Sequence, residues 1–342
     1  MQNLHHYRIK SLLLCILLLM QTFLFASCVN IGNQTANDGT YSKVFYFFDT
    51  FVTVTFYDEK DKVYFEDIEK YCAEYDYLFN RHLEGSDVWN INHSHGEPVT
   101  VSYITADLII EANAFSTLSN GAVDITVAPL LDLWDFTSEE ENHMPPSDED
   151  IRAALEHVDY RKVKVKDNTV TLLDEEMAID LGFIAKGYIA DMLKEYLVSM
   201  NVQRAIINLG GNIVVIGKKP DGSNYNVGVK KPFSKDDTSI CTVELSDTSI
   251  VTSGIYERCF TYNDKLYHHI LDPKTGYPVE NNLYQVSVVC EESTKADGLS
   301  TTLLILGEEK GMKFLEDYFP NAHALFIDDQ LKISGSAGFS GN

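Results

Sequence analysis

An acid and a hydroxyl spaced one helical turn apart are the side chains of this chain best suited to chemistry. Asp297 and Thr301 stand in residues 293–302, after a β-branched run at 286–289 and before an apolar run at 303–306, an order typical of a strand that leads into a helix. Positions i and i+4 of a helix lie on the same face. Two side-chain oxygens near the positive end of a helix form a site that suits Mg²⁺ and the phosphates it holds.

The same segment has a plainer interpretation. Thr294 is a favoured N-cap residue, and Asp297 stands three positions later, where a capping box places an acid. On this interpretation Asp297 only closes the start of its helix, and Thr301 only fills space. The choice between the two interpretations depends on the rest of the chain.

Composition and charge limit the functions that this chain can have. The chain has 342 residues, enough for one large domain or two closely packed ones, and 45% of them are hydrophobic. The formal net charge is -24, which argues against binding to a nucleic-acid backbone because such binding needs a positive face. The same charge favours solubility and is compatible with basic partners or divalent cations.

The first residues predict a lipoprotein leader. A basic stretch at 5–10 precedes a short apolar run at 11–25, and the order Leu-Phe-Ala-Ser-Cys that ends at Cys28 resembles a lipobox. We therefore predict a signal peptide over 1–27, lipid on Cys28, a tether over 28–40, and anchoring to the extracytoplasmic face of the cell membrane. The alternatives are an ordinary signal peptide or an uncleaved anchor, although the apolar run is short for a membrane span.

Four further cysteines follow the leader, at Cys72, Cys241, Cys259 and Cys290. Their wide spacing contains no CxxC and no zinc-binding pattern. Each stands in an apolar or strand-like context, so we expect buried thiols. One disulfide is the alternative, and the sequence does not pair its members.

Hydrophobic patterns along the rest of the chain predict an α+β protein. The β-rich stretch at 44–56 predicts one bent strand or two, and helical spacing marks 65–79 and 104–118. Because strands and helices alternate irregularly and hairpin signals are frequent, we expect mixed or antiparallel sheets packed against helices rather than a doubly wound parallel sheet. The Gly/Ser-rich tail at 333–342 is expected to be loose.

Two more segments contain side chains that could bind a ligand. Asp124 interrupts an apolar stretch, so it is either satisfied in a turn or faces a ligand. Residues 178–187 predict a strand, a glycine-bearing turn and a helix start with Lys186 in its first turns, a geometry that can hold phosphate. The chain contains no GxxxxGK and no GxGxxG motif, so this is not a P-loop, and a plain turn is the alternative.

The motifs, taken in chain order, resemble the ApbE family of FAD:protein FMN transferases. The resemblance runs from about Phe45 to about Gly338, within a predicted catalytic domain over 41–338. The matching segments are Asp49-Thr50 and residues 86–92, 119–124, 127–130, 180–187, 208–211, 252–256, 269–276 and 296–301.

The resemblance implies specific roles for residues of this chain. It implies that Asp297 and Thr301 give side-chain oxygens to Mg²⁺ and that Phe183 gives its backbone carbonyl. Phe48 replaces the methionine that often precedes Asp-Thr in the family, and would keep an apolar contact with the flavin. The other residues that match the family's FAD contacts are Ala122, Val123, Asp124, Asp180, Lys186 and Ile270.

The activity implied by the resemblance is Mg²⁺-dependent transfer of FMN from FAD to a Thr or Ser hydroxyl of an acceptor protein, with release of AMP. A general base must take the hydroxyl proton, and Asp297 and His269 are the two candidates. A Mg²⁺-dependent FAD pyrophosphatase that gives FMN and AMP uses the same metal site and stays open as an alternative. A non-catalytic flavin-binding lipoprotein is a third class, but it would not require the pair Asp297 and Thr301.

Family acceptors carry a Ser/Thr-Gly-Ala-Thr type of motif whose last Thr or Ser receives FMN. This chain contains no such string. We therefore predict that it does not modify itself and that it acts on another extracytoplasmic protein, one that serves electron transfer.

Overall fold

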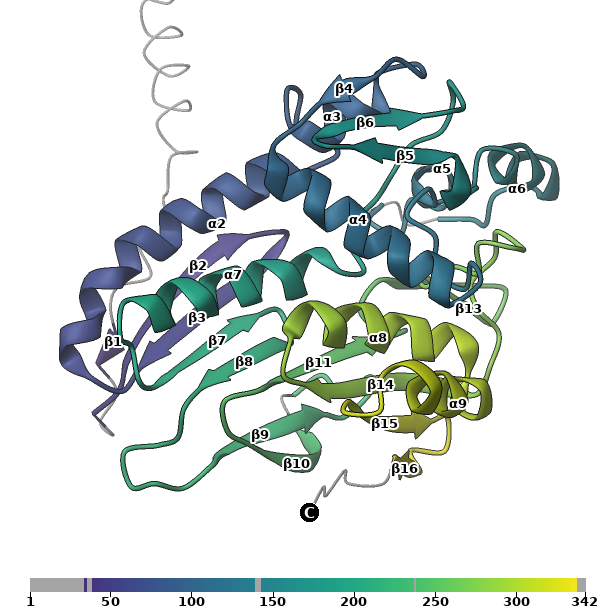
Figure 1. Ribbon diagram of the computed structural model, residues 1–342. Helices are drawn as coiled ribbons and strands as arrows, with labels where there is room; N and C mark the ends of the chain where they lie inside the picture. The colour runs from purple at the N-terminus through teal and green to yellow at the C-terminus, as the bar shows by residue number, and fades with distance from the viewer. Residues whose placement is uncertain (1–33, 36–38, 139–142, 237, 337–342) are drawn as a thin grey trace, which may run out of the picture.

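The structure is a computed structural model that describes residues 34–35, 39–138, 143–236 and 238–336. A nine-stranded antiparallel sheet forms its base (Figure 1). In spatial order its strands are β1 (Gln34–Thr35), β2 (Tyr41–Phe47), β3 (Thr50–Phe56), β7 (Ala205–Leu209), β8 (Asn212–Ile216), β11 (Ser249–Gly254), β14 (Leu283–Cys290), β15 (His323–Asp328) and β16 (Ile333–Gly335). The leader, Cys28 and most of the predicted tether lie outside the described residues.

Helices cover one face of this sheet (Figure 1). They are α2 (Phe65–Phe79), α7 (Ala185–Ser199), α8 (Ser293–Leu306) and α9 (Glu308–Tyr318), with a short 3-10 helix, η1 (Glu59–Tyr64), before α2. Alternation along β3 buries Val52, Val54 and Phe56 in one cluster with Ile68 of α2 and Leu193 of α7. Burial of these apolar faces fixes the register of the strands against the helices.

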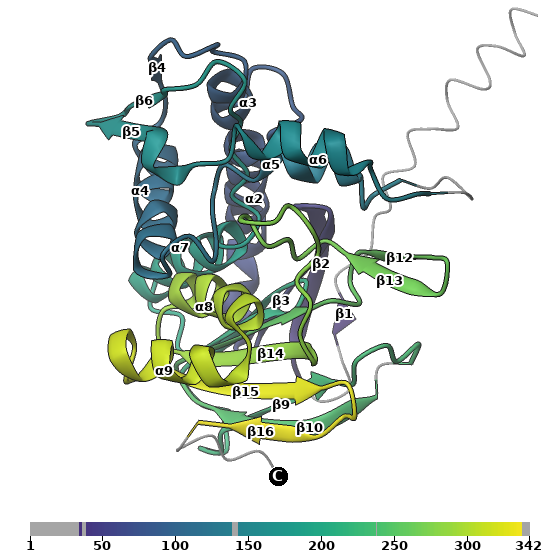
Figure 2. The ribbon, with the colours of Figure 1, turned by 90° about the vertical axis from the view of Figure 1, so that its right-hand side faces the viewer.

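A two-stranded hairpin, β9 (Tyr225–Lys230) and β10 (Ser239–Leu245), lies on the opposite side of the sheet (Figure 2). Residues of β9 alternate strictly between buried and exposed. Its buried side chains Tyr225 and Val227 share a cluster with Val215, Ile250 and Leu325 of the large sheet. The sheet therefore has core on both faces.

A smaller lobe lies above the helices (Figure 1). It contains α3 (Asp87–Asn92), α4 (Tyr103–Leu118), α5 (Ala128–Trp134), α6 (Asp148–Leu155), η2 (Tyr160–Lys162) and the three-stranded sheet of β4 (Val99–Thr100), β6 (Thr169–Leu172) and β5 (Val163–Lys166). Ile109 and Ile179 of the lobe share one buried cluster with Leu299 of α8. The lobe is thus packed continuously onto the helical layer.

The hairpin of β12 (Cys259–Tyr262) and β13 (Lys265–His268) projects from the body (Figure 2). Its Phe260 and Tyr267 pack against Trp134, whose indole N–H donates to the carbonyl of Gly276 at 2.8 Å. Among the residues that the structure describes, no helix is both long and apolar enough to cross a membrane.

The main sequence expectations hold. Strands β2 and β3 divide the stretch at 44–56, and α2 and α4 match the two predicted helices. The four cysteines after the leader are free thiols. Cys72 is buried, as predicted, whereas Cys241, Cys259 and Cys290 are only half-buried.

Two expectations are corrected. Residues 178–181 form no strand, because the amide of Asn92 pairs with both backbone groups of Ile179 and the N–H of Asp180 bonds to the carbonyl of Ile125. Residues 333–335 of the tail are not loose but form β16, which pairs with β15. Within the predicted tether, Gln34–Thr35 forms a short strand that pairs with β2, and the extent of the tether stays a prediction.

Candidate active site

A cavity of about 1150 Å³ lies where the helical layer, the sheet and the smaller lobe meet. This volume is slightly above the usual range for small-molecule sites and suits a dinucleotide. The predicted site residues that line it are Phe48, Val123, Asp124, Asp180, Phe183, Lys186, His269, Ile270, Asp297 and Thr301. Ala122 is buried next to them but does not line the cavity.

The carboxylate of Asp297 is the most deeply buried charge of the site, with only 3% of the residue exposed. Its Oδ2 accepts the backbone N–H of Gly187 at 2.8 Å, in the first turn of α7. Burial raises the pKa of Asp297, while the charge of Lys186 and the Gly187 hydrogen bond oppose that rise. A buried acid at a helix N-terminus, with one oxygen left for a ligand, is a natural place for a cation.

The predicted N-cap role of Thr294 is wrong. Helix α8 begins at Ser293, and Asp191 of α7 caps it from outside. The carboxylate of Asp191 accepts the N–H groups of Ser293 and Thr294 at 2.8 Å each and the Thr294 hydroxyl at 2.7 Å. Asp297 therefore does not cap its own helix and remains available to the cavity.

Helices α7 and α8 approach closely at Gly187. A Cβ added there would lie 2.7 Å from Cβ of Asp297 and would also overlap the carbonyl of Ser293. Only glycine lets the two helices come close enough for the Gly187 N–H to reach the carboxylate.

Thr301 stands one turn after Asp297, as predicted, and is 9% exposed. Its Oγ1 lies 2.9 Å from Oγ of Ser253 on β11, which also pairs with Ser300 at 2.7 Å. Asp297, Thr301 and Ser253 all line the cavity. The sequence motif around Ser253 was noted, but its place beside Thr301 depends on the β11–α8 packing.

The donor set fits a hard cation such as Mg²⁺. The acid and hydroxyls are all oxygen donors, the type that Mg²⁺ prefers. Within the described residues, no three His, Cys, Asp or Glu side chains gather closely enough to hold a metal ion alone. A metal here would complete its coordination with waters and substrate phosphates, which is the usual arrangement for Mg²⁺.

The turn before α7 contributes Phe183 and Lys186 to the cavity. The Phe183 ring meets Phe115 edge-on, with centroids 6.4 Å apart. The Lys186 ammonium donates to the carbonyl of Gly182 at 3.3 Å, so it is held beside Asp297 without a carboxylate partner of its own among the described ion pairs. The role of the Phe183 carbonyl as a metal ligand stays a prediction.

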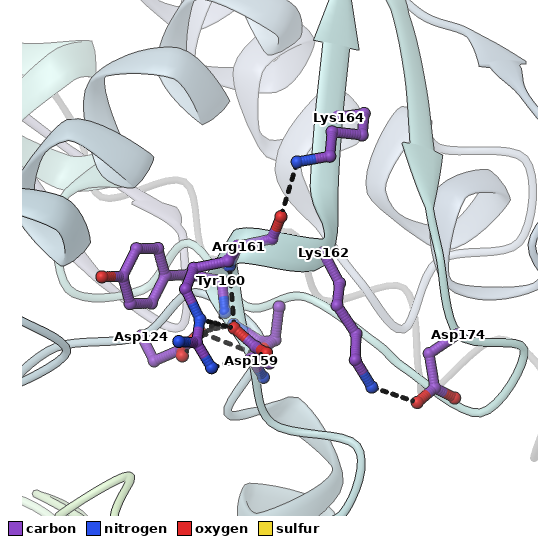
Figure 3. Close-up of polar contacts among 8 residues, drawn as sticks. Asp124, Asp159, Tyr160, Arg161, Lys162, Lys164 and Asp174 are labelled. Carbon is purple, nitrogen blue, oxygen red and sulfur yellow. Dashed lines mark hydrogen bonds and ion pairs between the residues drawn. The ribbon is translucent and has the colours of Figure 1, made fainter.

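Asp124 is both hydrogen-bonded within its loop and exposed to the cavity, the two alternatives that the sequence left open. Its Oδ1 accepts the N–H and hydroxyl of Thr126 at 2.8 and 2.6 Å, and its Oδ2 accepts the N–H of Tyr160 at 2.9 Å (Figure 3). Burial nevertheless raises the pKa of Asp124. The acid is thus satisfied in its loop and also lines the cavity.

Arg81 is a site residue that the sequence did not reveal. It follows α2 and bridges two acids of the cavity wall, with Nη1 2.7 Å from Oδ1 of Asp132 and Nε 3.0 Å from Oδ2 of Asp180. The other oxygen of Asp180 accepts the N–H of Gly182 at 2.8 Å. Arg81 therefore fixes Asp180 and the turn before α7, and no local motif marks it.

His269 lies at the cavity, beside β13, and is half-buried. Its Nδ1 lies 3.1 Å from the carbonyl of Arg258. A carbonyl only accepts, so Nδ1 carries the proton and Nε2 of the neutral ring keeps its lone pair. Burial lowers the pKa of His269 to about 4, so the ring is neutral near pH 7.

The β2–β3 turn brings Phe48 to the cavity through an unusual backbone conformation. Phe48 has φ 57° and Asp49 has φ 55°. The N–H of Phe48 donates to Oδ1 of Asp76 at 3.1 Å, which holds the turn in place. Ile270, 6% exposed, adds an apolar surface from the segment after β13.

Comparisons with known proteins agree with this geometry. The chain matches the model of the ApbE family over residues 48–326. It is 39% identical over 240 residues to a Klebsiella pneumoniae protein named FAD:protein FMN transferase, covering 69% of this chain and 73% of that protein. A Vibrio cholerae protein of the same name is 32% identical over 276 residues, covering 80% of this chain and 82% of that protein.

Solved structures give the same result. The crystal structure of the ApbE protein from Thermotoga maritima matches with a TM-score of 0.80 and 35% identity, covering 87% of this chain and 97% of that one. The flavin transferase ApbE from Vibrio cholerae matches with a TM-score of 0.77 and 29% identity, covering 88% of this chain and 98% of that one. The fold and family expected from the motifs are confirmed, and the chain belongs to the ApbE family.

Proposed function

We propose that this protein is a Mg²⁺-dependent FAD:protein FMN transferase that moves FMN from FAD to a Thr or Ser hydroxyl of an acceptor protein and releases AMP. The observation that carries the proposal is that one cavity contains the buried pair Asp297 and Thr301 together with all the predicted FAD contacts except Ala122. The names of the related proteins support the same activity.

The reaction breaks the phosphoanhydride bond of FAD and forms a phosphoester bond to the acceptor. The acceptor hydroxyl oxygen forms a bond to the FMN phosphorus, the bond from that phosphorus to the AMP oxygen breaks, and the hydroxyl proton passes to a base. Mg²⁺, held by Asp297 and Thr301, would neutralise the pyrophosphate charge and stabilise the departing AMP. Lys186 adds a positive charge on the same wall of the cavity.

Of the two candidate bases, the geometry favours His269. Asp297 already accepts a hydrogen bond from Gly187 through one oxygen, and metal binding would occupy the other. His269 is neutral and has its lone pair on Nε2, the form that can take a proton. We therefore assign the general base to His269 and metal binding to Asp297.

The acceptor and its compartment follow from the leader and the resemblance. Lipid on Cys28 would place the enzyme on the extracytoplasmic face of the membrane, where an acceptor with a Ser/Thr-Gly-Ala-Thr type motif would meet it. Enzyme and acceptor must share one side of the membrane for the transfer to occur. We expect the acceptor to serve electron transfer.

FAD hydrolysis to FMN and AMP is the alternative, because water can replace the acceptor hydroxyl at the same site. Incubation with FAD and Mg²⁺, with and without an acceptor protein, separates the two. If the protein is a transferase, free FMN should appear only slowly in the incubation without acceptor. The release of AMP should then rise with the concentration of acceptor. Rapid, acceptor-independent release of equal amounts of FMN and AMP would instead identify a pyrophosphatase.

A further inference from the structure

Asn212 is a buried amide with an unused donor. It is the first residue of β8, directly after the Gly210-Gly211 turn, and is 1% exposed. Its Oδ1 accepts the hydroxyl of Ser293 at 2.7 Å. Its Nδ2 makes no short hydrogen bond within the described residues, and a neighbouring acceptor is the Asp297 carboxylate, whose pKa the Asn212 side chain lowers as a hydrogen-bond donor. A buried donor that is not fully paired costs free energy.

The orientation of this amide is defined by its neighbours. If the amide were turned over, Oδ1 would face the Asp297 carboxylate, toward which the Asn212 side chain acts as a hydrogen-bond donor that lowers the pKa of the acid. Two acceptors facing each other repel, so the arrangement with Oδ1 on Ser293 is the favoured one. Nδ2 then lies on the side of Asp297, and because it carries two hydrogens, one can act on the acid while the other is free for a ligand.

The free donor belongs to the proposed active site. Asn212 lines the same cavity as Asp297, Lys186 and Thr301. A ligand for Nδ2 must offer an acceptor oxygen, and an anionic oxygen accepts most strongly. The pyrophosphate of FAD supplies such oxygens beside Lys186, whereas riboflavin carries no phosphate.

We propose that Nδ2 of Asn212 donates a hydrogen bond to a phosphate oxygen of bound FAD, which makes Asn212 a further substrate-binding residue. This inference rests on the proposed function. The alternative partner for Nδ2 is the Asp297 carboxylate, in which case Asn212 would position the metal-binding acid and leave the phosphates untouched.

The test compares Asn212→Ala with Asn208→Ala. Asn208 lies on β7, one residue before the strand ends at Leu209 on the other side of the same turn; its Oδ1 accepts the N–H of Gly211 at 3.0 Å, and it does not line the cavity. We would measure the Kd for FAD, the Kd for riboflavin, and the Kd for Mn²⁺ without flavin. Asn212→Ala should weaken FAD binding about tenfold, the value of one hydrogen bond to a charged group, while riboflavin and Mn²⁺ binding stay within about twofold.

Asn212→Asp provides a second variant that keeps the acceptor for Ser293 and the shape of the side chain. It should weaken FAD binding more than Asn212→Ala, because it removes the donor and adds a negative charge. Asn208→Ala should bind FAD like the wild type. Unchanged FAD binding in Asn212→Ala, or an equal loss for riboflavin, would overturn the inference.

Weaker Mn²⁺ binding by Asn212→Ala in the absence of flavin would also overturn it, in favour of a positioning role toward Asp297. A wild-type protein that fails to bind FAD would overturn the proposed function itself. Wild-type FAD binding together with normal binding by Asn212→Ala would overturn only this inference.

Discussion

The backbone N–H of Gly187 donates to Oδ2 of Asp297 at 2.8 Å, so the acid proposed to bind metal also caps the start of α7. Asp191 of α7 in turn caps the start of α8. The N-terminus of each helix is therefore capped by a carboxylate from the other helix. The positive end of the capped helix in turn stabilises the negative charge of that acid. The positive end of α7 lies at the cavity through Ala185 and Lys186, and α8 reaches the cavity one turn after its start, through Asp297.

Replacing Asp297 separates capping from metal binding. Asp297→Asn keeps an oxygen that can accept the Gly187 N–H, so the free energy of unfolding should stay within about 1 kcal/mol of wild type. It removes the charge for Mg²⁺, so FAD turnover should fall at least about 100-fold.

Asp297→Ala should also abolish turnover and remain folded, with a further loss of about 1 kcal/mol for the missing cap. Turnover assays with Mg²⁺, together with urea unfolding, test both variants. Wild-type turnover by either variant would show that the metal site is misplaced, and an unfolded Asp297→Ala would favour a purely structural role.

Asp191→Ala tests the cap on α8. The carboxylate satisfies two backbone N–H groups and one hydroxyl of α8, so its loss should lower the free energy of unfolding by about 2 kcal/mol. Asp317→Ala is the matched control, since the one side-chain partner of Asp317 in the described part of the chain is Lys313, in a surface ion pair. This variant should change stability by less than about 0.5 kcal/mol. Equal effects in urea unfolding would refute the capping role.

The buried imidazole of His268 predicts a pH-dependent stability. Burial lowers the pKa of His268 from 6.5 to about 4. Between these values the unfolded chain binds a proton that the folded protein does not, so the free energy of unfolding should fall as the pH drops from 6.5 toward 4.

His268→Gln removes this titration, so its stability should depend less steeply on pH over that range. Urea unfolding at several pH values measures both slopes. Parallel curves for wild type and His268→Gln would mean that His268 contributes nothing to the pH dependence.

Cys28→Ala tests the anchor. If lipid on Cys28 holds the mature protein at the membrane, the variant should lose membrane association in cell fractionation, because one covalent anchor is removed. A variant that stays in the membrane fraction to the same extent as wild type would indicate an uncleaved leader instead.

Local sequence signals predicted elements whose causes are local. Apolar spacing gave α2 and α4, and the ordered motifs led to the family and to Asp297 and Thr301. Relationships between distant segments were missed: the cap from Asp191, the Arg81 bridge to Asp180, and the place of the Asn212 amide beside Ser293 and Asp297. Each depends on how α7, α8 and the sheet pack, which no short window of sequence contains.

The absence of a strand at 178–181 has the same origin. The β-like composition of this stretch predicts a strand, and that prediction is wrong because side-chain and loop partners bond to its backbone groups in place of a neighbouring strand. Asn92, which provides two of those hydrogen bonds, is 87 residues away from Ile179 in the chain.

Intact-mass measurement of an acceptor protein tests the central claim most directly. A protein with a Ser/Thr-Gly-Ala-Thr segment would be incubated with this enzyme, FAD and Mg²⁺, with EDTA as the control. We predict that the acceptor gains one FMN as a phosphoester on the last Thr or Ser, that AMP appears in equal amount, and that EDTA prevents both. An acceptor of unchanged mass while FAD is consumed, or a covalent FMN on this chain itself, would contradict the account.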